Sequence, residues 1–472
     1  MGETSALVRH RAGVGRLVAS YDAIPPDGRV RLAKRTSNLF RARERSSTRG
    51  LDVSGLTAVI GVDPTARVAD VAGMCTYEDL VAATLPHGLA PLVVPQLKTI
   101  TLGGAVTGLG IESTSFRNGL PHESVLEMDI LTGAGDIVTA RPGGEHESLY
   151  RGFPNSYGSL GYATRLRIEL EPVRAFVGLR HLRFHSIDDL VASLGEVVRD
   201  GSHDGERVDY IDGVVFSATE SYLCLGTQTD EPGPASDYTG QRIFYRSIQH
   251  DGPDPRRDRL TTHDYLWRWD TDWFWCSRAF GVQNPWVRRL WPRHWRRSST
   301  YWRLVALDHR FHVADRIDAR RGRAPGERVV QDVEIPLEGC AEFLHWFLRE
   351  IPIEPVWLCP LRLREQSSVL AGPDDEERPW PLYPLRSGET YVNVGFWSSV
   401  PADPDAREGA ANRLIEAEVT RLHGHKSLYS DAYYDRDEFA RLYGGTAYAA
   451  LKRRYDPNAR LLDLYTKAVQ RK

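Results

Sequence analysis

The sequence predicts an α+β fold with two lobes. Its 472 residues exceed what one ordinary hydrophobic core accommodates, and a hydrophobic content of 41% with twelve tryptophans is typical of a well-packed globular interior. Short β-rich runs dominate residues 29–173, whereas longer charged segments and a dense tryptophan cluster follow. We therefore expect a first domain over residues 1–173, a second over 174–425, and a helical segment over 426–472 that packs on the body.

The first domain is expected to consist of short strands with one clear helix. Four runs bounded by Gly, Asp, Pro or Asn predict strands, over 57–62, 67–72, 125–131 and 164–170. The turn-prone tetrapeptide 63–66 joins the first two runs and predicts a β-hairpin. Thr76 can cap a helix over 76–85, in which apolar residues recur at helical spacing before Pro86. Further along the chain, residues 229–240 are loop-like, and helices are predicted over 436–443 and 447–455.

Composition excludes several classes of function. The net charge is −3 with both signs intermixed, which argues against a nucleic-acid partner. The five cysteines lack the spacing of zinc ligands, so we expect no metal and a reducing compartment. No run reaches the ~18 apolar residues of a membrane span, and the first residues do not form a targeting segment, so a cytoplasmic location is expected.

A glycine-rich stretch over residues 101–110 is a candidate anion-binding loop. Glycine admits positive φ and lets backbone N–H groups approach a pyrophosphate without a Cβ between them. A tight bend between strands explains the same glycines equally well, and no βαβ unit of the Rossmann type surrounds them. Two further elements, at 117–119 and 155–162, lie in the same strand-rich region. Three such elements favour a long cofactor that lies across the sheet.

Residues 30–173 resemble the flavin domain of the vanillyl-alcohol-oxidase superfamily, known as the PCMH-type FAD-binding domain. The resemblance implies FAD held by a first loop at 33–37, a second at 101–104 and a third at 156–161, although the first departs from the usual glycine-rich form. Arg31, beside the first loop, either pairs with a cofactor phosphate or forms a structural ion pair. The cofactor-binding residues implied by position are Arg31, Ala33, Lys34, Arg35, Thr36, Ser37, Thr101, Leu102, Gly103, Gly104, Gly108, Gly110, Ser113, Gly119, Gly158 and Gly161.

The resemblance also implies how the flavin is held. Relatives that bind FAD covalently use a histidine in the first loop, a cysteine near the second, or both. Here residues 31–45 contain no histidine and residues 94–104 contain no cysteine. We therefore expect non-covalent FAD.

Strings in both lobes are similar to delta-24-sterol reductases and to bacterial reductases that convert 10-methylene acyl chains to the 10-methyl (tuberculostearic) form. The strings span 108–113, 330–333, 357–360, 428–433 and 437–439. The resemblance implies an FAD-dependent oxidoreductase that acts on CH–CH bonds with NADPH as electron donor. The arginine-dominated composition and the absence of an anchor favour a 10-methylene fatty acyl substrate, carried on a phospholipid and made by a partner methyltransferase. A sterol or terpenoid side-chain reductase and a sugar or alcohol oxidase are the alternatives.

An isolated alkene constrains the mechanism, because hydride addition alone would leave an unstabilised carbanion. Protonation by a general acid therefore has to accompany hydride transfer from flavin N5, in a site that excludes water. The candidate acids are Glu112, which follows the second loop, Asp332, in a second-domain string, and Tyr433; Glu334 and His122 are further candidates. For any one of them an ordinary hydrogen-bonding role or a surface charge is the more common explanation, because catalysis needs one acid and the chain has many.

Eight tryptophans and seven arginines share the stretch 267–302. Such a mixture is typical of a membrane interface, where rings lie at headgroup depth and guanidinium groups meet phosphates. A domain core or a dimer contact explains it equally well on composition. The resemblance to lipid enzymes favours membrane contact, peripheral at the inner face.

Overall fold

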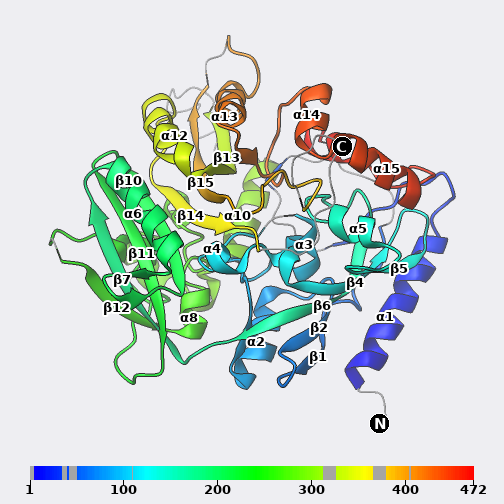
Figure 1. Ribbon diagram of the computed structural model, residues 1–472, viewed down its shortest axis with the longest axis horizontal. Coiled ribbons are helices and arrows are strands. Elements are labelled where there is room, and N and C mark those ends of the chain that lie inside the picture. The colour runs from blue at the N-terminus through cyan, green and yellow to red at the C-terminus, as the bar shows by residue number, and fades with distance from the viewer. Residues whose placement is uncertain are drawn as a thin grey trace.

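The computed structural model describes residues 5–34, 40–41, 50–108, 110–252, 254–311, 326–364, 379–402 and 405–471, without the side chains of 306–311. It has two large antiparallel sheets with helices packed around them (Figure 1). This confirms the predicted α+β fold. The chain passes from the first sheet to the second between Pro172 and Phe176.

The first sheet has six strands among the described residues, in the order β1-β2-β6-β4-β5, and β3 also pairs with β6. The strands are β1 (Val59–Asp63), β2 (Val68–Ala72), β3 (Leu89–Pro91), β4 (Val125–Leu131), β5 (Ile137–Ala140) and β6 (Tyr162–Pro172). The predicted hairpin is confirmed, since β1 and β2 pair antiparallel through the turn after Asp63. All four runs predicted as strands lie in this sheet.

Short helices surround the first sheet: α2 (Tyr77–Thr84), η1 (Leu85–His87), α3 (Leu102–Thr107), α4 (Ser115–Asn118), η2 (Pro121–Ser124) and α5 (Glu147–Gly152). The predicted cap of α2 is confirmed, because the hydroxyl of Thr76 accepts a hydrogen bond from the backbone N–H of Asp79 at 3.2 Å. A helix that the sequence had not suggested, α1 (Ser5–Asp22), lies along the edge of this part of the molecule (Figure 1). Its Tyr21 donates a hydrogen bond to the carbonyl of Gly133 at 2.8 Å.

The second sheet has eight strands among the described residues, in the order β12-β7-β11-β10-β14-β15-β13-β16. They are β7 (Phe176–Phe184), β10 (Tyr210–Ser217), β11 (Glu220–Thr229), β12 (Arg256–Thr261), β13 (Gly326–Pro336), β14 (Val356–Arg362), β15 (Thr390–Pro401) and β16 (His425–Lys426). A separate hairpin joins β8 (Ser202–His203) and β9 (Glu206–Arg207). Residues 230–240 form the predicted loop.

The two faces of the second sheet differ in chemistry. One face is apolar, with residues such as Val333, Leu358 and Val394 packed under α6 (Ile187–Asp200), α12 (Leu337–Glu350) and α13 (Ala410–Arg421). Successive residues of a strand point to opposite faces. Asp332 and Cys359, each next to one of these apolar residues, therefore lie on the other face, together with further polar and aromatic side chains.

The stretch rich in tryptophan and arginine forms irregular structure with the short helices η3 (Cys276–Phe280), α9 (Pro285–Leu290) and η4 (Arg293–Trp295), and α10 (Ser298–Phe311) begins at its end. The helices α7 (Phe244–Ile248) and α8 (Thr262–Leu266) precede it. Four of its tryptophans, Trp267, Trp269, Trp273 and Trp275, are buried. For these four the core alternative is correct and membrane contact is not, because the second sheet and the first domain cover their rings. Trp286 and Trp295, in contrast, are exposed.

The C-terminal segment contains α14 (Arg436–Leu442), α15 (Gly445–Tyr455) and α16 (Leu464–Ala468), so both helices predicted there are confirmed. It packs against the first sheet's part of the molecule (Figure 1). Nζ of Lys452 donates to the carbonyl of Ser159, and Nζ of Lys467 to that of Gly158, both at 2.8 Å. None of the described helices combines the length and apolarity that crossing a lipid bilayer requires.

Candidate flavin and acid site

The first two predicted loops meet at helix α3. Nζ of Lys34 donates a hydrogen bond to Oγ1 of Thr101 at 3.0 Å. The same oxygen accepts from the backbone N–H of Gly104 at 3.2 Å, which makes Thr101 the N-cap of α3. The ammonium group of Lys34, which favours anions, therefore lies at the start of α3.

The glycines of the second loop differ in role. A Cβ on Gly103 would lie 2.6 Å from the carbonyl oxygen of Gly73, so this glycine allows α3 to pack on the chain before α2. The N–H groups of Leu102 and Gly103 bond to carbonyls of Cys75 and Gly73, both at 2.9 Å. These N–H groups stabilise the fold, whereas the sequence had suggested that they point at an anion. Around Gly104 a Cβ would meet only Oγ1 of Thr101 and, at 3.7 Å, Nζ of Lys34.

The third loop touches the end of α3. The backbone N–H of Tyr157 donates to the carbonyl of Thr107 at 2.8 Å, and a Cβ on Gly108 would lie 3.1 Å from the Tyr157 ring. Arg41, four residues after the first loop, places its guanidinium 5.0 Å from the centre of the same ring. The first and second loops thus meet at Thr101 at the start of α3, and the third loop meets the end of this helix.

The remaining described residues that were predicted to bind the cofactor contact other parts of the protein. The backbone groups of Arg31 and Ala33 pair with Leu51, and the hydroxyl of Ser113 lies 2.9 Å from that of Tyr265. The other glycines pack closely on neighbours: Gly110 on Pro95 and Pro121, Gly119 on Glu123, Gly158 on Tyr162, and Gly161 on Leu131. Three predicted positions, Arg35, Thr36 and Ser37, lie outside the described residues.

Two carboxyl groups of β13 lie next to these loops. Asp332 and Glu334 face Gly395 and Asn393 of β15 across the sheet. Nδ2 of Asn393 donates to Oδ1 of Asp332 at 3.1 Å, and desolvation raises the pKa of Asp332 to about 6. Asp332 retains partial exposure, whereas Glu334 is fully buried.

Glu334 is the more strongly shifted of the two acids. Burial, with a smaller contribution from the charge of Asp332, raises the pKa of Glu334 well above its usual value. Oε1 accepts a hydrogen bond from Ser427 at 2.8 Å, and Oε2 lies 4.0 Å from Nε2 of His425. Burial of this kind favours the protonated form of the carboxyl.

Tyrosine hydroxyls connect this acid cluster, defined by Asp332 and Glu334, to the flavin loops. Burial raises the pKa of Tyr157, and the nearby carboxyl of Glu334 adds to this shift. Burial also raises the pKa of Tyr429, and the carboxyl of Asp332 adds to that shift. Nε1 of Trp397 donates to the hydroxyl of Tyr429 at 3.1 Å. The tyrosines and the two acids therefore share one poorly hydrated region at the meeting point of the loops.

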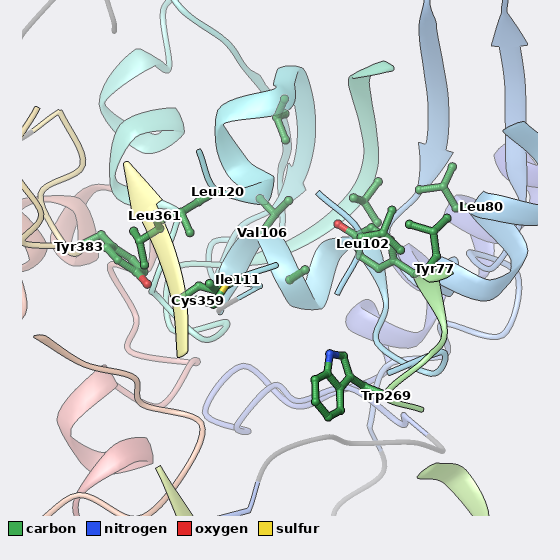
Figure 2. Close-up of a cluster of buried hydrophobic side chains, with 14 of the residues drawn as sticks. Tyr77, Leu80, Leu102, Val106, Ile111, Leu120, Trp269, Cys359, Leu361 and Tyr383 are labelled. Carbon is green, nitrogen blue, oxygen red and sulfur yellow. The ribbon is translucent and has the colours of Figure 1, made fainter. Parts of the chain in front are cut away.

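The apolar part of the region comes from both lobes. Figure 2 shows Cys359 and Leu361 of β14 beside Leu120, Ile111 and the α3 residue Val106. All five are buried. Such walls exclude water, which strengthens electrostatic interactions inside the site.

Glu112, a predicted acid, belongs to a different network. Nη2 of Arg268 lies 3.1 Å from Oε1 of Glu112 and 2.8 Å from Oδ2 of Asp212. Desolvation raises the pKa of Glu112, and Arg268 opposes the shift. Trp269 also donates to Asp212, at 3.0 Å. These buried, paired charges join the loop after α3 to the second sheet.

Tyr433 and His122 are also held elsewhere. The Tyr433 ring lies between Arg413 and Arg471, each 4.9 Å from the ring centre. The ring of His122 meets the edge of Trp380 at 4.4 Å, and burial lowers the pKa of this imidazole to about 3. Of the five candidate acids, the structure brings Asp332 and Glu334 together beside the loops.

Four residues of this site were absent from the sequence analysis: Tyr157 as a contact, and Asn393, His425 and Tyr429. One signal could have suggested part of the set. Asp332, Glu334 and Asn393 are polar residues inside runs that are otherwise β-rich and apolar. A polar residue in the middle of a buried strand requires a partner, and here the partners are one another.

Comparison with known proteins agrees with the predicted cofactor. Residues 26–141 match the family model of an FAD binding domain. The chain is 24% identical over 428 residues to Delta(24)-sterol reductase of Rattus norvegicus, which covers 88% of this chain and 75% of the relative. The Arabidopsis thaliana enzyme of the same name is 24% identical over 445 residues, with 89% and 76% covered. Cytokinin dehydrogenase 6 of Oryza sativa subsp. japonica is 39% identical over 107 residues, only 23% of this chain and 20% of that one.

The fold and the site thus define an FAD-dependent oxidoreductase with an FAD-binding domain of the PCMH type. Within that class, the chain is similar along most of its length to Delta(24)-sterol reductases, which confirms this part of the resemblance.

The residues present fit FAD. Lys34 offers a cation, Thr101 a hydroxyl, and Gly104 an approach free of a Cβ, all within one contact region. Tyr157 and Gly108 border the same region from the third loop and the end of α3. A diphosphate would meet suitable partners at Lys34, Thr101 and Gly104. An aromatic ring system would meet them toward Tyr157 and Gly108.

Proposed function

We propose that this protein reduces an isolated carbon–carbon double bond in a lipid, with FAD as cofactor and NADPH as electron source. The observation that carries the proposal is the carboxyl of Asp332, with its pKa raised to about 6, next to the meeting point of the flavin loops. As substrate we propose a 10-methylene fatty acyl chain, delivered on a phospholipid and supplied by a methyltransferase. The product is the 10-methyl-branched chain.

The residues of the chain account for the proton. Asp332 is the acid that can meet a substrate, because it is the partly accessible member of the pair. Asn393 orients it through the hydrogen bond to Oδ1. Glu334 lies two residues away on the same face, and burial favours its protonated form, which carries no charge. Bound FAD would supply the hydride that completes saturation.

The apolar walls suit the carbon centre. Protonation of a 1,1-disubstituted alkene develops positive charge at a tertiary carbon, which water would capture. Leu120, Val106 and Leu361 contribute buried hydrocarbon near the loops and exclude water there. A lipid chain is the substrate class that gains most from such walls, since each buried methylene contributes about 0.8 kcal/mol.

A sterol or terpenoid side chain is the second candidate substrate. The named activity of the relatives favours it, because Delta(24)-sterol reductases align with 88% of the chain. A sugar or alcohol oxidase is the third candidate, since flavin domains of this type occur with other activities, as the cytokinin dehydrogenase similarity illustrates.

A two-part anaerobic experiment tests the proposal. NADPH should bleach the flavin of the FAD-loaded protein, and a 10-methylene acyl phospholipid should restore its absorbance with formation of the saturated product. Reoxidation by a sterol with an unsaturated side chain, but not by the acyl lipid, would show that the substrate is a sterol and not the acyl chain. Rapid oxygen consumption with an alcohol, and no response to any alkene, would overturn the reductase proposal.

A further inference from the structure

One short segment of the second domain exposes large apolar side chains. Trp286 is 76% exposed, Leu290 85%, Trp295 51% and Val287 39%. We refer to these four residues as the α9 surface. Only four other large hydrophobic side chains are exposed among the described residues, and they are dispersed over α1, β4, β5 and α13. A concentration of this kind marks an interaction site more often than a random surface does.

The segment that carries the α9 surface is firmly anchored. On the inner side of α9, Arg288 is 1% exposed, and its guanidinium binds both oxygens of Asp272, at 2.7 and 3.1 Å. Arg296 is also buried and donates to the carbonyls of Thr239 and Gly240, at 2.6 and 2.7 Å. The usual pattern is therefore inverted. Arg288 and Arg296 point inward, while Trp286 and Leu290, one helical turn apart, point to solvent.

The charges beside the α9 surface are mainly positive. Arg289, Arg293 and His294, on the same short segment, are exposed. Arg293 lies 3.4 Å from Asp237 in an ion pair whose two side chains are both exposed. Exposed tryptophans with flanking arginines suit the headgroup region of an anionic bilayer, where rings take the interfacial depth and guanidinium groups meet phosphates.

We propose that the α9 surface docks this protein on anionic lipid membranes, with Trp286, Leu290 and Trp295 inserted at the interface and Arg289 in contact with lipid phosphates. The docking stands on the surface itself and does not depend on the proposed reaction. A second copy of this chain is the other occupant that the test separates.

The docking surface and the acid cluster share one structural segment. The tilted rings of Phe274 and Trp397 are in contact, with ring centres 4.4 Å apart, and Trp397 donates to Tyr429 of the acid site. Eleven residues after Phe274, α9 begins. If the proposed function holds, docking would present the lipid to the side of the molecule on which this segment lies.

Vesicle co-sedimentation at low salt tests the docking with the FAD-loaded full chain. Vesicles of phosphatidylcholine and phosphatidylglycerol in equal parts should bind the protein, and vesicles of phosphatidylcholine alone should bind it far more weakly. The double variant Trp286→Ser, Leu290→Ser should lose affinity by about tenfold or more, because two large apolar side chains no longer enter the bilayer. Arg289→Glu should weaken binding to anionic vesicles by about fivefold or more.

Leu414→Ser provides a matched control, since Leu414 is 47% exposed on α13 and lies outside the α9 surface. It should bind vesicles like the unchanged protein, and thermal melts should show that all variants are folded. No binding to anionic vesicles, or equal loss in the control, would overturn the proposal. A dimer that dissociates on the double substitution, measured by sedimentation velocity, would assign the α9 surface to self-association instead. None of these outcomes depends on turnover.

Discussion

Nζ of Lys34 lies 3.0 Å from Oγ1 of Thr101, although 67 positions separate the two residues along the chain. The hydroxyl caps α3, so the lysine is fixed at a helix N-terminus. A cation that is already held in place loses little freedom when an anion arrives. The pair is the strongest structural reason to place the FAD diphosphate at this point.

The substitution Lys34→Met should weaken FAD binding about tenfold, because a hydrogen bond to a charged group contributes about 1.5–3 kcal/mol. Titration of the apoprotein with FAD, followed by quenching of flavin fluorescence, measures the change. Lys34→Arg retains the charge and should preserve most of the affinity. Equal affinity in all three proteins would remove Lys34 from the cofactor site.

Asp332→Asn should slow alkene reduction by a factor of about 10²–10⁴, the usual contribution of a positioned general acid. Reduction of the flavin by NADPH should be unchanged, because that half-reaction needs no proton from Asp332. Stopped-flow absorbance separates the two steps. Tyr433→Phe is the control, since the Tyr433 ring lies between Arg413 and Arg471, and it should leave both steps intact. The same loss in Tyr433→Phe would contradict the assignment.

The rate of the alkene step should depend on pH through Asp332. Its pKa is raised to about 6 by burial, and only the protonated form can donate. The rate is therefore expected to be constant well below pH 6 and to fall as pH rises through about 6, by tenfold for each further pH unit. Single-turnover rates of the reduced enzyme across this range provide the measurement. A rate that increases with pH would indicate a base instead.

Arg268→Met should destabilise the protein by about 3–5 kcal/mol, because it leaves Glu112 and Asp212 buried without their cation. Urea unfolding followed by tryptophan fluorescence can detect this. Arg257→Met removes an exposed arginine that pairs with Glu206 at 2.7 Å, and should change stability by less than about 1 kcal/mol. Similar losses in both variants would argue against a special role for the buried network.

Acid precipitation of the purified protein should release FAD into the supernatant. The sequence has no histidine in residues 31–45 and no cysteine in residues 94–104, the two places where relatives attach flavin. Absorbance spectra of the supernatant and of the redissolved pellet make the comparison. Yellow colour retained by the pellet would show a covalent bond, and peptide mapping would locate it.

Local patterns predicted much of the fold. The β1–β2 hairpin, the Thr76 cap and the helices α14 and α15 depend on neighbours in sequence, and all were predicted. Helix α1 was missed because few of its residues are buried, among them Leu17 and Tyr21, and charged residues interrupt its apolar pattern. Its position depends on contacts with residues far along the chain.

The site was only partly predictable for the same reason. Asp332 was a candidate because its string is similar to those of relatives, but its partner Asn393 lies 61 positions away. The sequence could not distinguish it from Glu112, because the distinction depends on whether a cation faces the carboxyl. Arg268 faces Glu112 from 156 positions away. The burial of each tryptophan likewise depends on residues that are distant in the sequence and not on its local sequence.

Phe40 and Arg41, shortly after the first loop, contact the C-terminal segment directly. The backbone N–H of Phe40 donates to the carbonyl of Tyr429 at 2.9 Å, and Arg41 donates to that of Leu428. During synthesis on the ribosome, these partners of Phe40 and Arg41 emerge some 390 positions after them, since 387 positions separate Arg41 from Leu428. A nascent chain can thus form its hairpins early yet gain these contacts only once Leu428 and Tyr429 have been made. Flavin capture would then report that the chain has been made and folded at least as far as these residues.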